Sequence, residues 1–224
     1  MTTITPHEPT TPTGERFVAT KQPVVALKRR TIDSVLISFG AVLTAALVVA
    51  ASLLTWGANF AKDYVYDELA SQNITFPPAA ALEEQGRGDL VKYADQKVDT
   101  GKEAEAYASF INGHLTGIAD GATYAELGAP ERAATDAVTA AKADGASEAT
   151  IADLQSKADA ITGQRNTLFK GETLRGLLLT AFAWSTVGRI AGYAAMAAFV
   201  AGALMLVLVL LGLRHHHKVV VKDS

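Results

Sequence analysis

The sequence predicts an all-α membrane protein: two transmembrane helices extended outside as an antiparallel stalk, with a small helical extracytoplasmic domain. Two observations predict the spans: residues 34–61 carry no charge, and 24 uncharged residues lie between Arg189 and Arg214. A helix of 24 residues is about 36 Å long, enough to cross a hydrocarbon core with some tilt. The third observation is that the segment between the spans shows helical periodicity and no convincing strand.

Composition narrows the range of functions. The chain has 224 residues, of which 49% are hydrophobic, and it contains no cysteine. Disulfides, thiolate catalysis and cysteine-bound iron–sulfur clusters are therefore excluded for this chain. Residues 57–190 hold twelve Lys and Arg against nineteen Asp and Glu. This acidic balance argues against a nucleic-acid partner.

Basic residues flank both spans on the side of the termini, at 28–30 and at 214–218. The positive-inside rule therefore predicts a multi-pass plasma-membrane protein with both termini cytoplasmic. Residues 1–32 are rich in Thr and Pro without helical or strand periodicity, and we expect them to form a disordered cytoplasmic tail. Residues 214–224 are expected to form a second cytoplasmic tail.

Residues 33–72 are predicted to form the first transmembrane helix with its outward extension, and residues 173–213 the second. Small residues recur four apart in both spans. This spacing lets two helix backbones approach closely and predicts that the two small-residue faces pair. The helix-packing candidates are Ala41, Ala45, Ala46, Ala50, Ala194, Ala198 and Gly202.

The first helix is expected to continue beyond the membrane surface. Trp56, Phe60 and Tyr64 are spaced four apart, and Leu69 continues the apolar stripe among charged residues. Trp56 also suits the aromatic belt at a membrane boundary. The prolines at 77–78 end the helix.

The second helix is expected to have a matching extension. Residues 57–72 and 174–189 are each 16 residues long, about 24 Å of helix, and equal lengths predict an antiparallel stalk. The alternative is that residues 176–188 form an interfacial or re-entrant helix. On the stalk interpretation Arg189 lies at the outer headgroup boundary, where its long side chain reaches polar surroundings.

Residues 73–172 are predicted to form the extracytoplasmic domain, a loosely packed helical bundle. Residues 79–97 form short turns or a loop, because glycines interrupt them. Thr123 and Glu126 match a capping box, and Gly145 is typical of a helix end. Further helices are expected over 102–118, 131–144 and 147–161. The inner face of the first of them is predicted to be Ala106, Phe110, Ile111 and Leu115.

Residues 107–127 (YASFINGHLTGIADGATYAEL) resemble a family of small actinobacterial two-span membrane proteins with an extracytoplasmic pattern similar to "NIT…AYA..IN.H…TYAEL". Matching positions are Asn73 to Thr75, Tyr107, Ala108, Ile111, Asn112, His114, Gly121, Thr123 to Leu127, Leu174 and Arg175. The chain differs at 118–120, at about 132–163, where it has extra residues, and at Arg189. The resemblance implies the two-span topology. It implies no activity, although some members carry the label aromatic ring-opening dioxygenase.

Such a dioxygenase needs iron held by histidine and carboxylate ligands. His114 is the one histidine expected outside the membrane, so the exterior cannot supply two histidine ligands. Neither a nucleophile motif nor a phosphate-binding loop is present. We therefore expect no enzymatic activity, no catalytic residue, no metal and no cofactor. His114 is expected to form a hydrogen bond at a helix end, and Tyr124 with Glu126 to belong to a cap.

The expected function is that of a non-enzymatic accessory or scaffold protein in an envelope or respiratory assembly. Its partners are the lipid bilayer and other membrane subunits or further copies of itself. Exterior contact candidates are Phe60, Tyr64, Leu69, Tyr107, His114 and Tyr124, and membrane-boundary candidates are Trp56, Arg189, Arg214 and Lys218. The alternative is an extracytoplasmic ligand-binding or sensing module without its own output domain.

Overall fold

The computed structural model describes residues 29–222, and over this range it is all-helical apart from turns and one isolated β-bridge. Two helices are long and apolar enough to cross a membrane, which confirms the predicted fold class at that level. The elements are α1 (Arg29–Ser71), α2 (Ala79–Glu84), the 3-10 turn η1 (Gly88–Tyr93), α3 (Gly101–Leu115), the 3-10 turn η2 (Ile118–Gly121), α4 (Gly128–Ala143) and α5 (Glu148–Lys222). Most of the predicted N-terminal tail, residues 1–28, lies outside the described residues, whereas residues 29–32 belong to α1.

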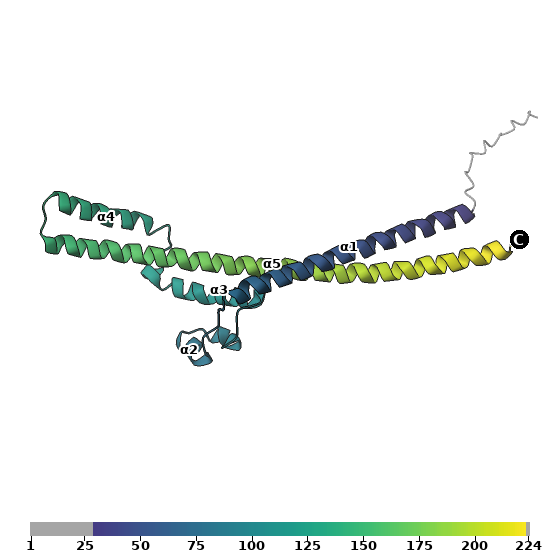
Figure 1. The fold of residues 1–224 in the computed structure, drawn as a ribbon, viewed down its shortest axis with the longest axis horizontal. Coiled ribbons are helices and arrows are strands. Elements are labelled where there is room, and N and C mark those ends of the chain that lie inside the picture. The colour runs from purple at the N-terminus through teal and green to yellow at the C-terminus, as the bar shows by residue number, and fades with distance from the viewer. Residues whose placement is uncertain (1–28, 223–224) are drawn as a thin grey trace, which may run out of the picture.

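α5 is a single helix of 75 residues that runs the length of the molecule (Figure 1). The other long helices pack on it in succession, with α1 on its C-terminal half, α3 on its middle and α4 on its N-terminal end. α2 and η1 lie to one side, next to α3. The start of α1 and the end of α5 therefore lie at the same end of the molecule (Figure 1).

The continuity of α5 differs from the expected separate helices over 147–161 and from about 173 onward. The last proline of the chain is Pro130, so the sequence that forms α5 contains no residue that forces a break. Gly171 does not break the helix, because it provides the space in which Leu115 of α3 packs. At the other end, α5 also includes residues 214–222, which were expected to form a cytoplasmic tail.

α1 and α5 run in opposite directions and meet along a seam that combines small and larger apolar side chains. Gly40 packs against Val209, and Gly188 packs against Ala61. Along α1, eight buried or half-buried positions follow one another in alternating steps of four and three, the repeat of a coiled-coil seam. They are Gly40, Thr44, Leu47, Ala51, Leu54, Ala58, Ala61 and Val65.

Most of the small residues predicted to form this contact lie outside it. Five of them are exposed: Ala41, Ala45, Ala46, Ala50 and Ala194. Ala198 is half-buried, and Gly202 is buried against Leu47 and Val48. The predicted pairing of the α1 alanines with α5 is therefore wrong. Small residues occur on several faces of α1, so their four-residue spacing alone does not identify the face that meets α5.

Away from the seam, the uncharged parts of α1 and α5 expose large apolar side chains, as expected for helices that contact lipid. On α1 they include Val35, Leu36, Phe39, Val42, Val49 and Leu53, and on α5 Ile190, Met196, Val200, Leu204, Leu208 and Leu211. An aqueous surface of this composition would be unfavourable, whereas a bilayer accommodates it. These two helices are the ones that could span a membrane.

A small apolar core lies where α1 ends beside the middle of α5. Phe76, Leu82 and Val98 are its largest fully buried side chains. The ring of Phe76 stacks on that of Tyr93 at 5.3 Å and meets that of Tyr107 edge-on at 5.1 Å. The core also includes buried residues of α1, α3 and α5, so it fixes these three helices together. The interior face predicted for α3 is confirmed at Ala106, Phe110 and Leu115, whereas Ile111 is half-buried.

Local signals set several helix ends. Gly145, which follows the C-cap residue Asp144 of α4, has φ +68°, as predicted for a helix end. Glu126 and Thr123 form the expected reciprocal hydrogen bonds, although α4 begins two residues later, at Gly128. The capping box that starts α3, in which the Glu103 carboxylate accepts from the Thr100 amide at 2.9 Å, was not predicted.

Substitution of Gly101, the first residue of α3, tests how closely α3 approaches α5. A Cβ atom at Gly101 would overlap the side chain of Ser185 and lie 3.4 Å from the Cα atom of Phe182. Gly101→Ala is therefore expected to lower the free energy of unfolding by about 1–3 kcal/mol, the usual cost of overpacking. The control is Gly163→Ala, where a Cβ atom meets nothing within 4 Å, and it is expected to raise this free energy by about 0.5 kcal/mol. Denaturant unfolding in detergent, followed by circular dichroism, measures both, and equal effects would contradict the close contact.

Candidate interaction surface

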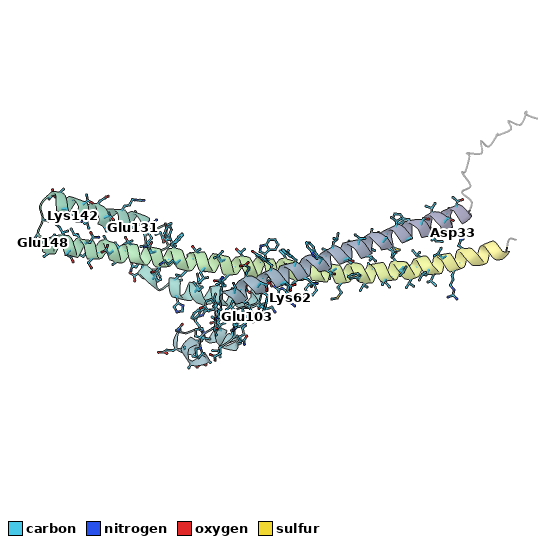
Figure 2. All side chains as sticks on the ribbon, in the orientation of Figure 1. Asp33, Lys62, Glu103, Glu131, Lys142 and Glu148 are labelled. Carbon is cyan, nitrogen blue, oxygen red and sulfur yellow. The ribbon has the colours of Figure 1, made fainter. Side chains whose placement is uncertain are left out.

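The uncharged segments of α1 and α5 end at the same height along the helix pair. Gly188 packs against Ala61, so Lys62 and Arg189, the next charged residues, lie at one level. Figure 2 shows Lys62 where α1 crosses α5, and Asp33 near the far end of the pair. Between these levels neither helix carries a charged residue. The two levels are where a membrane-embedded segment of this helix pair would meet water.

The predicted boundary residues are consistent with these levels where the structure describes them. Trp56 is exposed, and the Arg189 guanidinium donates to the Thr186 hydroxyl at 3.0 Å while remaining exposed. Arg214 is exposed near the end of α5. Lys218 belongs to α5, but its side chain lies outside the described part of the structure. Charged side chains at these heights can reach polar surroundings without entering hydrocarbon.

Two of the predicted contact residues, Phe60 and Tyr64, form a ridge of stacked rings along α1 together with Trp56, a predicted membrane-boundary residue. The ring of Phe60 lies 5.8 Å from that of Trp56 and 6.1 Å from that of Tyr64. All three rings are at least half exposed. Leu69, which was predicted to continue this exposed stripe, is instead buried, because α1 turns that side toward α3 and α5.

A groove of about 290 Å³ lies between α1 and α5 just beyond Lys62 and Arg189. Its residues are mainly apolar, with Glu68, Gln72 and Thr180 as the polar exceptions. The remaining residues that line it are Tyr64, Val65, Leu69, Ile74, Leu174, Leu177, Leu178, Ala181 and Trp184. Tyr64 and Leu69 on the α1 side of this groove were predicted from the sequence, whereas the residues on the α5 side were not.

One continuous apolar surface includes the outer part of this groove. Tyr64, Leu177 and Trp184 line the groove, Phe60 stacks on Tyr64, and Val187 lies beside Trp184 in an adjoining shallow pocket. Each of the five side chains is at least half exposed. We call this set the outer apolar face. A sequence signal for its α5 part exists, because Leu177 and Trp184 are seven residues apart and therefore share a helix face.

The other predicted contact residues have structural roles. Tyr107 is half-buried between the rings of Phe76 and Phe110, and burial raises the pKa of its hydroxyl. The His114 Nδ1 atom lies 3.1 Å from the Phe110 carbonyl oxygen, a hydrogen bond in the last turn of α3. Its ring also meets that of Phe110 edge-on at 4.5 Å. The predicted helix-end role of His114 is therefore confirmed.

Arg165 of α5 holds the start of α4 and was not predicted as a key residue. Its guanidinium lies 2.5 Å from the Glu131 carboxylate, donates to the Tyr124 carbonyl at 3.3 Å, and lies over the Tyr124 ring at 4.1 Å. Hydrogen bonds from the side chains of Thr162 and Arg165 lower the pKa of Glu131, and the one from Thr162 has the larger effect. Hydrogen bonds from Thr123 lower the pKa of Glu126. Tyr124 thus belongs to the contact that attaches α4 to α5.

Within residues 29–222, His, Asp and Glu side chains do not form a group of three or more that could hold a metal ion. The chain was also compared with known proteins, and no protein-family model, curated protein or solved structure matches it. The resemblance to actinobacterial two-span proteins therefore stays a prediction. What the geometry offers is a surface for contact, concentrated at the outer apolar face.

The Glu131 contact predicts how α4 responds to pH. The pKa of Glu131 is lowered from its usual 4.5, so its charged form stabilises the folded state above pH 4.5, and this contribution is lost as the pH falls below that value. Amide hydrogen exchange of α4, corrected for intrinsic rates, should therefore show less protection in acid. Glu131→Gln should remove that pH dependence. Asp136→Asn, on the same helix and without an ion pair among the described residues, should leave it unchanged.

Proposed function

We propose that this chain is a non-enzymatic accessory or scaffold protein of an envelope or respiratory assembly in the plasma membrane. Residues 34–61 and 190–213 lie in the bilayer, and both termini are cytoplasmic. The parts of α1 and α5 beyond Lys62 and Arg189 stand outside as an antiparallel stalk. The exposed apolar surface of the uncharged segments and the basic residues near both termini support this placement.

The observation that carries the proposal is the continuity of α5. Residues 148–189 extend the candidate membrane span without a break, which corresponds to about 60 Å of helix beyond Arg189. α3 and α4 pack along this extension. In the proposed placement, each of them is therefore held at a set height above the bilayer. A scaffold needs such fixed heights, because a partner in the same membrane can bind it only where the two contact surfaces lie at the same height.

The chemistry of the outer surface favours contact over catalysis. A catalytic or small-molecule site usually combines an apolar pocket with a few convergent polar groups. The groove beside Tyr64 and Trp184 is lined mainly by apolar side chains, and its polar members are Glu68, Gln72 and Thr180. An open groove of this kind is suited to the side chains of another protein.

Purification from the native membrane in mild detergent, followed by mass spectrometry, tests the proposal. The tagged chain is expected to bring a reproducible set of membrane proteins in stoichiometric amounts. Gly163→Pro should reduce their recovery, because proline removes one helix hydrogen bond and bends α5 at the level where α4 begins. Gly163→Ala, at the same open position, is the control and should retain them.

Two results would contradict the accessory role. One is a chain that leaves the membrane without any other protein under conditions that preserve known membrane assemblies. The other is a full set of partners with Gly163→Pro, which would show that the continuity of α5 does not matter for assembly.

A further inference from the structure

A cavity of about 260 Å³ lies between α1 and α5 at the end of the helix pair where α1 begins and α5 ends (Figure 1). We call it the terminal cavity. Its walls are apolar apart from two lining residues, Asp33 of α1 and His215 of α5. Asp33 is the first lining residue along α1 and His215 the last along α5. Because the two helices are antiparallel, both polar groups lie at the same end of the cavity, so one end is polar and the remainder is apolar.

The terminal cavity opens to the side of the helix pair. Leu36 and Leu208 line it, and these side chains are 63% and 61% exposed. Its lining residues fall within 33–40 of α1 and 205–215 of α5, which corresponds to about 10–15 Å of helix. One leaflet of a hydrocarbon core is about 15 Å thick. In the proposed placement, the cavity therefore extends from the cytoplasmic headgroup level through most of one leaflet.

The two helices are held together around this cavity. A Cβ atom at Gly212 would lie 3.1 Å from the Cγ1 atom of Ile37, so the backbone of α5 comes close to α1 there. Nearer the termini, the Ser34 hydroxyl oxygen lies 3.5 Å from the His216 Nε2 atom. The cavity is thus a recess in the side of a packed helix pair, with both helices contributing to its walls.

The polar end of the cavity lies in a basic part of the chain. Residues 29–40 and 205–218 contain four Lys and Arg against a single Asp. Arg214, next to His215 in the chain, is exposed. Basic pockets between transmembrane helices on the cytoplasmic side are suited to anionic lipid headgroups. The carboxylate of Asp33 does not reverse the positive balance, and it can accept hydrogen bonds from the hydroxyls of a headgroup.

Shape and polarity together select a lipid as the occupant. A partner helix about 10 Å wide and as long as the cavity would fill on the order of 800 Å³, far more than the cavity holds. A soluble anion would use the polar end and leave the apolar walls uncovered. A phospholipid matches both parts, because its phosphate stays at the headgroup level while a narrow acyl chain follows the apolar walls.

We propose that the terminal cavity binds one anionic phospholipid of the cytoplasmic leaflet, with its phosphate near Arg214 and His215 and an acyl chain along Leu36 and Leu208. The site rests on the membrane placement given under the proposed function, and it requires no protein partner. A lipid bound there contacts both α1 and α5, so it stabilises the helix pair in membranes that contain it.

Native mass spectrometry of the purified full chain tests the site. The chain in mild detergent is exposed to equal amounts of phosphatidylglycerol and phosphatidylcholine with the same acyl chains. One phosphatidylglycerol per chain is expected to stay bound in preference to phosphatidylcholine, and free glycerol phosphate is not expected to displace it. Retention of neither lipid, or equal retention of both, would overturn the proposal. Displacement by glycerol phosphate would overturn the lipid as occupant, because it would identify a site for a free phosphate anion.

A pair of adjacent variants tests the position of the acyl chain. Leu36 and Val35 are 63% and 61% exposed neighbours on α1, and Leu36 lines the cavity whereas Val35 does not. Leu36→Trp adds bulk at the opening and is expected to lower the affinity for phosphatidylglycerol at least about 5-fold, as for a moderately overfilled site. Val35→Trp is the control and should retain the lipid. Circular dichroism verifies that both remain helical, and equal affinities of the two variants would overturn the assigned cavity.

A second pair of variants tests the charge at the polar end. Arg214→Gln is expected to lower the affinity for phosphatidylglycerol about 5-fold, the effect of one basic residue near an anionic surface. Arg189→Gln removes the same charge at the other end of the uncharged segment of α5 and should leave the affinity unchanged. An equal loss from both variants, or no loss from Arg214→Gln, would overturn the assigned headgroup position.

The leaflet is tested separately. The chain contains no cysteine, so Thr31→Cys, at an exposed position near the start of α1, provides a single thiol. A membrane-impermeant maleimide is expected to label it only after the cells are opened, and labelling in intact cells would overturn the cytoplasmic leaflet. Lipid retention is measured on the purified chain alone, so its failure is distinguishable from failure of the accessory role, which is measured by the partners recovered from the native membrane.

Discussion

The unbroken backbone hydrogen-bond ladder of α5 is the constraint on which the rest of the structure depends. A helix of 75 residues gains most of its stability from packing along an apolar stripe. α1, α3 and α4 cover successive parts of that stripe, and each of them is shorter than the helix it covers. The positions of the aromatic ridge, the groove and the Arg165 contact along the molecule are therefore all set by one helix, α5. If α5 bent, these surfaces would lose their fixed relation to the two candidate membrane spans.

Much of the fold could be predicted because its signals are local. The uncharged segments indicate the two candidate spans, the prolines at 77–78 mark the end of α1, and Gly145 marks the end of α4. His114 was correctly interpreted as a helix-end residue, because a single histidine between the two candidate spans lacks the partners that catalysis or metal binding needs. The α1 half of the candidate surface was also predicted, since Phe60 and Tyr64 stand out as aromatic residues among charged neighbours.

The remainder depends on contacts between segments far apart in the chain. Separate helices were expected over 147–161 and from about 173 onward, but the chain forms one continuous helix, α5, and α3 packs against it at Gly171. Small residues occur around most of α1, so only the position of α5 selects Gly40, Thr44 and Ala51 for the seam. Trp184 belongs to the candidate surface only because it lies across a groove from Tyr64, and Tyr64 is more than one hundred residues earlier in the chain.

Continuity of α5 is the central claim, and a distance along the helix tests it most directly. Nitroxide labels at Ala160→Cys and Ile190→Cys, both exposed positions, would lie thirty residues apart. Electron–electron resonance in lipid vesicles, with excess unlabelled chain to isolate each labelled molecule, measures their separation. One unbroken helix predicts a single narrow distribution of distances between the two labels, centred at about 45 Å. A markedly shorter or broad distribution would show that the chain breaks between the outer part and the candidate membrane span, and would contradict the account.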